Sequence, residues 1–181
     1  MASASAQEAF PPPPSPPVLP DVDPFYAPPG GDVLASVAPG TVLRFREISA
    51  KAYYIFPIKG QAWQLMYRST DHKGQPVAMV STVLVPANAP ASGRKLVAYN
   101  VAYDALTLRC APSYSFVRGT ALEQVLMQSA LRDGNVLVVP DYEGLRSLWR
   151  WGSTPATACW TASARRRPLR RRGWPGGPRR W

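Results

Sequence analysis

Asp141 and Glu143 are the residues whose type and spacing best suit acid–base chemistry. They follow the apolar run Val136–Pro140, and the active sites of open α/β sheets collect where such strands end. Paired carboxylates at that edge would suit proton transfer. The alternative is that both side chains only hold the loop in place, and we favour this structural role.

Nucleophilic catalysis needs a serine or cysteine beside a histidine, and the sequence offers little for it. No G-x-S-x-G motif occurs, and Ser153 has no strand before it and no second glycine after it. His72 is the only histidine and lies in a predicted hairpin turn, where we expect an exposed residue. Cys110 and Cys159 lack metal-ligand spacing, so we predict no metal and no cofactor.

The charge of the chain changes at Gly144. Residues 1–144 carry 11 Lys+Arg and 11 Asp+Glu, whereas residues 145–181 carry 10 Arg and no acid, so the net charge of +10 lies in that tail. Five of the six tryptophans lie there too. Such a composition binds phosphates, stacks on bases or lies on anionic membranes. We expect non-specific polyanion binding and no specific nucleic-acid partner.

Hydrophobic periodicity in the balanced part of the chain predicts a β-sheet. The turn Asp71–Gly74 joins two of the expected strands into a hairpin. The last two strands are short and apolar, as in a buried parallel pair. The expected strands are Thr41–Ile48, Ala62–Thr70, Val77–Pro86, Lys95–Val101 and Val136–Pro140.

One amphipathic helix is predicted at Leu122–Arg132, between the two short strands, and Asp133-Gly134 ends it. We expect Ala102–Ser115 to be a loop. A hairpin followed by strand, helix and strand is how a mixed, mostly parallel α/β sheet begins. The apolar face of the helix is expected to consist of Leu122, Val125, Leu126 and, less strictly, Ala130.

Three segments are therefore expected. Residues 1–22 are Pro-rich and predicted to be disordered. Residues 23–144 form the folded unit, and residues 145–181 form a disordered basic tail, because few aliphatic side chains and a high charge cannot offset the entropy of ordering. We find no basic start followed by an apolar segment, so no signal peptide is visible.

Six stretches in this order and spacing resemble the secretory lipases, the lipase A-type branch of the α/β-hydrolases of fungi and actinobacteria. The resemblance covers about residues 23–144. It implies an incomplete α/β-hydrolase fold, with the N-terminal strands and the first crossover helix. The matching stretches are DPFY (23–26), WQLMYRSTD (63–71), STVLVPA (81–87), YNVAYDAL (99–106), CAPSY (110–114) and VVPDYEG (138–144).

The resemblance also implies a function. The family consists of secreted enzymes that hydrolyse triacylglycerols and other carboxylic esters with a Ser-His-Asp triad. Asp104 stands where the family places an aspartate whose backbone N–H helps to hold the oxyanion; its alternative role is to cap a turn. Cys110 matches a family cysteine that forms a disulfide with a residue much further along.

The family's triad lies beyond residue 144, where this chain stops resembling the family. The codons of the tail offer an explanation for this loss of resemblance. Cys159, Trp160 and Thr161 must be encoded by TGY-TGG-ACN, which in a shifted frame reads Leu-Asp, and the neighbouring codons permit the family-like segment V-L-D-G-I-R. We therefore expect that the reading frame slipped between Leu145 and Trp149. The expected product is a truncated, inactive secretory lipase. The alternatives are a basic-tailed nucleic-acid or membrane binder and, third, a regulatory lipid-binding fragment.

Overall fold

The computed structural model describes residues 7–52, 56–103, 106–121 and 123–146 of the chain. Within these residues a six-stranded sheet has the order β1-β2-β5-β6-β8-β7, and β3 and β4 form a separate small pair. The strands are β1 (Glu8–Ala9), β2 (Val42–Ile48), β3 (Lys51–Ala52), β4 (Phe56–Pro57), β5 (Gly60–Thr70), β6 (Pro76–Pro86), β7 (Leu96–Ala98) and β8 (Val136–Pro140).

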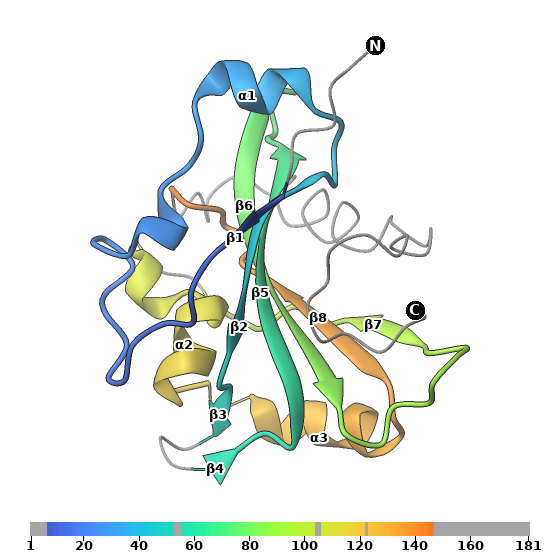
Figure 1. Ribbon diagram of the computed structural model, residues 1–181. Helices are drawn as coiled ribbons and strands as arrows, with labels where there is room; N and C mark the ends of the chain where they lie inside the picture. Colours follow the sequence, from blue (N-terminus) through green and yellow to red (C-terminus); the bar gives the residue numbers. More distant parts are fainter. Residues whose placement is uncertain (1–6, 53–55, 104–105, 122, 147–181) are drawn as a thin grey trace.

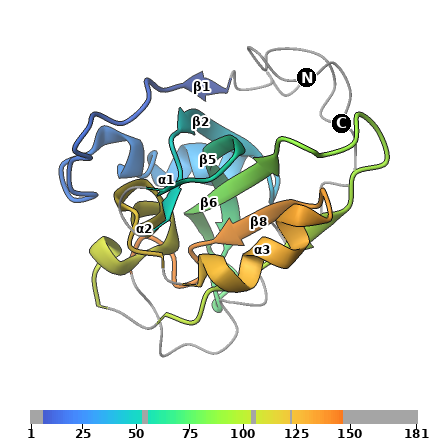
Figure 2. The ribbon, with the colours of Figure 1, turned by 90° about the horizontal axis from the view of Figure 1, so that it is seen from below.

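Short helical segments surround the sheet. Two are 3₁₀ turns, η1 (Pro24–Tyr26) and η2 (Leu108–Cys110), and three are α-helices, α1 (Gly31–Ser36), α2 (Pro112–Arg118) and α3 (Gln124–Arg132). Figure 1 shows the long strands β5 and β6 running through the molecule, with α1 near one end and α3 near the other. Figure 2 shows β1, β2, β5, β6 and β8 in order across the sheet, with α3 beside β8.

The predicted hairpin is confirmed as β5 and β6. The two strands pair antiparallel from Gly60 opposite Pro86 to Thr70 opposite Pro76. The turn is held by Asp71, whose Oδ1 accepts hydrogen bonds from the backbone amides of Lys73 and Gln75, each at 2.8 Å. An aspartate that bonds its own following backbone is typical of such turns.

The predicted strand–helix–strand unit is also confirmed. β7 and β8 are parallel neighbours, with Leu96 opposite Val136 and Ala98 opposite Val138, and α3 lies between them in the chain. On its other side β8 pairs antiparallel with β6. The result is a mixed α/β sheet, as predicted, but in the described residues three of its five strand pairings are antiparallel, so it is not mostly parallel. The sheet brings the ends of β7 and β8 to one edge.

One helix was missed. The sequence predicted a loop at Ala102–Ser115, whereas the structure has α2 at Pro112–Arg118, with Phe116 fully buried against the sheet. Pro112 occupies the first helical turn, where a missing amide costs nothing, and Gly119 ends the helix with a φ of 88°. The proline that lies within the predicted loop is in fact at the start of a helix.

The predicted apolar face of α3 was wrong at Val125 and Leu126, whereas Ala130 packs against the core as predicted and Leu122 lies outside the described residues. Val125 and Leu126 are 52% and 66% exposed, whereas Met127 is 1% exposed and packs in the same cluster as Phe116 of α2. The helix is therefore rotated so that Met127, not Leu126, faces the sheet. Both stripes have helical spacing, and the contact with the sheet selects between them.

Part of the Pro-rich segment also differs from its prediction. Glu8 and Ala9 form β1, which pairs parallel with β2, and the amide of Phe10 donates to the carbonyl of Phe45 at 2.8 Å. Phe10 packs against the cluster that contains Phe25. Burial of this large aromatic ring opposes the entropic cost of ordering this short stretch. The expected disorder of residues 1–6 and 147–181 concerns residues outside those described.

Candidate active site

The loops that follow β7 and β8 lie next to each other at one edge of the sheet. The amide of Tyr99, just after β7, donates to the carbonyl of Val138 in β8 at 2.9 Å. Because the two strands are parallel, their carboxyl ends meet at the same edge, where the sites of open α/β sheets collect. This edge is the position that the sequence analysis gave to the candidate site.

Two tyrosines connect these loops. The hydroxyl of Tyr142 donates to the carbonyl of Tyr103 at 2.9 Å and accepts from the amide of the same residue at 3.2 Å. The hydroxyl of Tyr103 in turn accepts from the amide of Glu143 at 3.2 Å. Their rings are tilted, with centroids 4.8 Å apart. Residue 103 is therefore tied to the loop after β8 through both its backbone and its side chain.

Asp104, the predicted oxyanion-hole residue, lies outside the described residues, as does Ala105. Its role stays a prediction, and the structure places only its neighbours. On the amino-terminal side, the amide of Ala102 donates to Oε1 of Glu123 at 3.0 Å. Glu123 directly precedes α3, so the crossover helix also holds the loop that leads to residue 104.

Asp141 is fully buried and bonded at both carboxylate oxygens. Its Oδ1 accepts from the amide of Ser113 at 2.9 Å, and its Oδ2 bonds the hydroxyl of the same serine at 2.5 Å. Burial raises the pKa of Asp141 to about 7, although both bonds from Ser113 lower it. These contacts support the structural role that we favoured over acid–base chemistry, because they hold the loop after β8 to α2.

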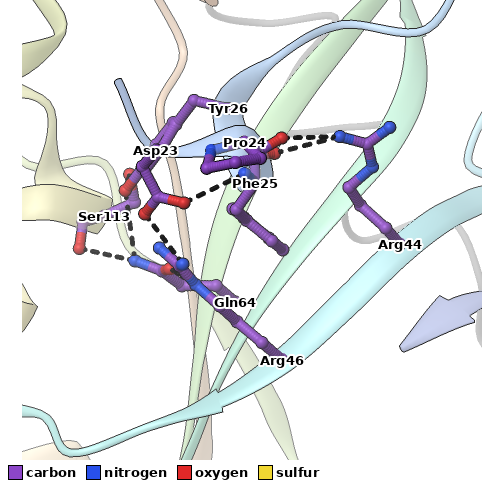
Figure 3. Close-up of polar contacts among 8 residues, drawn as sticks. All are labelled: Asp23, Pro24, Phe25, Tyr26, Arg44, Arg46, Gln64 and Ser113. Carbon is purple, nitrogen blue, oxygen red and sulfur yellow. Dashed lines mark hydrogen bonds and ion pairs between the residues drawn. The ribbon is translucent and has the colours of Figure 1, made fainter. Parts of the chain in front are cut away.

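A buried polar network continues from Ser113 to strand β2 (Figure 3). The Ser113 hydroxyl lies 2.9 Å from the hydroxyl of Tyr26. Gln64 Nε2 donates to the Tyr26 hydroxyl at 3.3 Å and to the Ser113 carbonyl at 2.8 Å. Gln64 Oε1 accepts from Arg46 Nε at 2.7 Å, and Arg46 pairs with Asp23 at 2.8 Å. The DPFY segment, two strands, α2 and the β8 loop are thereby connected.

The sequence analysis missed this network. Arg46 and Gln64 alternate with apolar residues in their strands, which is typical of side chains that face water. Both are buried, because η1 lies over that face and supplies Asp23 and Tyr26. The DPFY stretch was the sequence signal that could have indicated this network, but the sequence analysis used it only as part of the family resemblance.

The other candidate residues lie apart from these contacts. His72 lies in the β5–β6 turn, as predicted, but it is half-buried rather than exposed. Cys110 is exposed at the end of η2, and Cys159 lies outside the described residues. In the described part of the chain, no group of three or more His, Cys, Asp or Glu is placed to hold a metal. None of its helices is long and apolar enough to cross a membrane.

A cavity of about 810 Å³ is lined in part by the loop after β8, through Glu143, Gly144, Leu145 and Arg146. The rest of its wall comes from several other segments, and includes Tyr26 of the DPFY segment, Leu34 of α1, and Val77 and Met79 of β6. Neither Tyr103 nor Tyr142 lines this cavity.

Curated proteins similar to this chain are lipases. The chain is 41% identical over 141 residues to a protein of Mycobacterium tuberculosis named "Probable inactive lipase", covering 74% of this chain and 31% of that protein. It is 40% identical over 154 residues to lipase A of Arthroderma benhamiae, covering 75% and 32%. A secreted triacylglycerol lipase of Malassezia restricta is 40% identical over 140 residues, covering 72% and 29%. The chain thus spans about a third of the length of these relatives. No protein-family model matches it.

Solved structures agree with these relatives. The chain superimposes on lipase A of Candida antarctica in its closed state with a TM-score of 0.71 and 30% identity, over 80% of this chain and 35% of that one. A cell-wall-degrading esterase of Xanthomonas oryzae shares the fold alone, with a TM-score of 0.54 and 20% identity over 70% and 36% of the two chains.

The sheet order and the two adjoining loops define the N-terminal portion of an α/β-hydrolase fold. Within that class the similarity is to the lipase A-type secretory lipases, as the six sequence stretches indicated. This chain is therefore a lipase-family protein.

Proposed function

We propose that the edge formed by the β7 and β8 loops is the oxyanion-hole side of an ester-hydrolase site. The observation that carries the proposal is the double tie between Tyr103 and Tyr142, which fixes the residue directly before Asp104. The backbone N–H of Asp104 would stabilise the negative charge that develops on the carbonyl oxygen of an ester. The parent activity would be hydrolysis of triacylglycerols or other carboxylic esters by a secreted enzyme, as the name of the Malassezia relative supports.

We further propose that residues 1–181 by themselves do not hydrolyse esters. The sequence contains no G-x-S-x-G, and its only histidine lies in the β5–β6 turn. An oxyanion donor without a nucleophile and a general base cannot complete acyl transfer. The purified chain should hydrolyse short-chain nitrophenyl esters no faster than buffer does. Turnover that follows the protein through successive purification steps would overturn this expectation.

The tail is proposed to be the product of a lost reading frame. The support is the charge change at Gly144 together with the Leu-Asp pair forced by Cys159–Thr161 in the shifted frame. Resequencing codons 140–165 tests it directly. A one-base change between codons 144 and 149 should restore V-L-D-G-I-R, then a G-x-S-x-G motif, then Asp and His. A corrected frame that reaches a stop codon without G-x-S-x-G would argue against the parent enzyme.

The alternative function, a basic-tailed binder, is supported by one observation. The tail combines 10 Arg with five Trp and no acid. Such a tail should bind polyanions in a salt-sensitive way whatever its origin. Binding that discriminates one nucleic-acid sequence from another at physiological salt would favour this alternative, whereas binding that depends only on charge would not.

A further inference from the structure

The six-stranded sheet has two outer edges, and they differ in how they are protected. At one edge, β1 has only two residues, its Glu8 carboxylate pairs with Arg44 at 3.4 Å, and the prolines at 11–14 follow closely. Short length, charge and proline are the features that keep an edge strand from pairing with another chain. At the other edge, β7 lies beyond β8 (Figure 1) and contains neither a charge nor a proline. The β7 edge is therefore the one that is open to a further strand.

Backbone geometry identifies the groups of β7 that face outward. The carbonyl of Lys95 accepts a hydrogen bond from β8 and the amide of Tyr99 donates one to β8, each at 2.9 Å. In a parallel ladder alternate residues face the neighbouring strand, so Leu96 and Ala98 direct their N–H and C=O groups away from β8. In the described part of the chain no strand pairs with β7 on that side.

The side chains along this edge are apolar and open to solvent. Leu96 is 47% exposed and Ala98 is also exposed, and both lie on the same face of the sheet. Val97 lies on the opposite face and packs against the core cluster that contains Phe116. Parallel strands are ordinarily covered on both faces, so an exposed leucine on a parallel edge strand is unusual. Covering it with another strand would bury apolar surface, which is favourable.

We infer that the outer edge of β7 is an interface for a second copy of this chain, with the two β7 strands antiparallel about a two-fold axis at Val97. Leu96 of each copy then lies opposite Ala98 of the other. Residues whose backbone groups face outward exchange both of their hydrogen bonds in such a pair, so all the outward groups of β7 are used. The large leucine meets the small alanine on one face, and the two Val97 side chains meet on the other.

The charges of the chain are compatible with this partner. Residues 1–144 carry 11 Lys+Arg and 11 Asp+Glu, so two copies do not repel through this part of the chain. In the inferred register Lys95 lies opposite Tyr99, and Arg94 lies opposite Asn100, so no like charges face each other across the strands. The two-fold axis uses the β7 edge of both copies, and the assembly therefore closes at a dimer. This interface is independent of the proposed ester-hydrolase site.

Sedimentation velocity of the 181-residue chain tests the interface. The salt concentration is about 0.3 M, which screens repulsion between the basic tails. Over about a hundredfold range of protein concentration, the chain should convert reversibly from monomer to dimer. Leu96→Lys places a charge on the shared edge of both copies and should raise the dissociation constant about tenfold or more. Leu126→Lys, the same substitution at a 66% exposed leucine of α3, is the matched control and should leave the dissociation constant unchanged.

Hydrogen exchange on the unmodified chain covers the case in which Leu96→Lys does not fold. The amides of Leu96 and Ala98 should exchange more slowly as the protein concentration rises, whereas the amide of Val97, which faces β8, should change little. Exchange at Leu96 and Ala98 that does not depend on concentration would overturn the inference. So would a chain that stays monomeric, or one that associates beyond the dimer. A dimer that Leu96→Lys leaves intact would assign the contact to the tail or to another surface, and would equally overturn it.

Discussion

The pKa of Asp141 makes a specific prediction about stability and pH. Its folded-state pKa is about 7, compared with 3.8 for an ordinary aspartate, and burial is the main cause. Between these two values the folded chain binds a proton that the unfolded chain releases. Stability must therefore fall as the pH rises through this range, and the loss is complete above the folded-state pKa.

The magnitude follows from the two pKa values. Each unit is worth about 1.4 kcal/mol, so the full loss is about 4 kcal/mol, of which about 3 kcal/mol develops between pH 5 and pH 8. Asp141→Asn removes the titration but keeps an oxygen for the Ser113 amide and a donor for the Ser113 hydroxyl. Any rearrangement toward Tyr26 in this variant would add a cost that does not depend on pH.

Urea unfolding at pH 5 and pH 8 measures this effect. The unfolding free energy of Asp141→Asn minus that of the unmodified chain should increase by about 3 kcal/mol from pH 5 to pH 8. The subtraction cancels the other titrating groups. Asp133→Asn, at an exposed residue that follows α3, is the matched control. A flat difference for Asp141→Asn would mean that the folded chain holds Asp141 ionised, and the reasoning from burial would be refuted.

Two further predictions use matched pairs in the same unfolding assay. Asp23→Asn leaves the buried Arg46 charge without its partner and should lower the unfolding free energy by about 3–5 kcal/mol. Asp21→Asn, in the exposed pair with Arg109, should lower it by about 0–1 kcal/mol. Equal losses for the two variants would contradict the buried pair. Met127→Ala should lower the unfolding free energy by about 2–5 kcal/mol. Leu126→Ala, one residue earlier, should lower it by less than about 0.5 kcal/mol. A larger loss for Leu126→Ala than for Met127→Ala would mean that Leu126 faces the sheet, as the sequence predicted.

The β5–β6 hairpin and the β7–α3–β8 unit were predictable because their signals are local. The largely apolar run of β5 and the Asp71 turn lie within a continuous stretch of chain. β8 is buried along its whole length, which is why it reads as a continuous apolar run. Elements of this kind can be located without knowing what packs against them.

The orientation of α3 was not predictable for the opposite reason. Val125 and Leu126 belong to one set of apolar residues at helical spacing with Leu122, and Met127 belongs to another with Leu131. Met127 and Leu131 meet the cluster formed by Phe116 and the sheet, whereas Val125 and Leu126 are exposed. α2 itself was missed because its seven residues are stabilised mainly by that contact, and short helices have little intrinsic stability.

The buried network shows the same limit for polar residues. A strand pattern sends Arg46 and Gln64 toward water. Residues distant in the chain reverse that by supplying partners: Asp23 for Arg46, and Tyr26 and Ser113 for Gln64. Desolvation makes each of these groups costly unless every member is bonded. The network therefore favours one placement of the DPFY segment over others. Because it ends at Ser113 and Asp141, that placement extends to the turn that carries Tyr142.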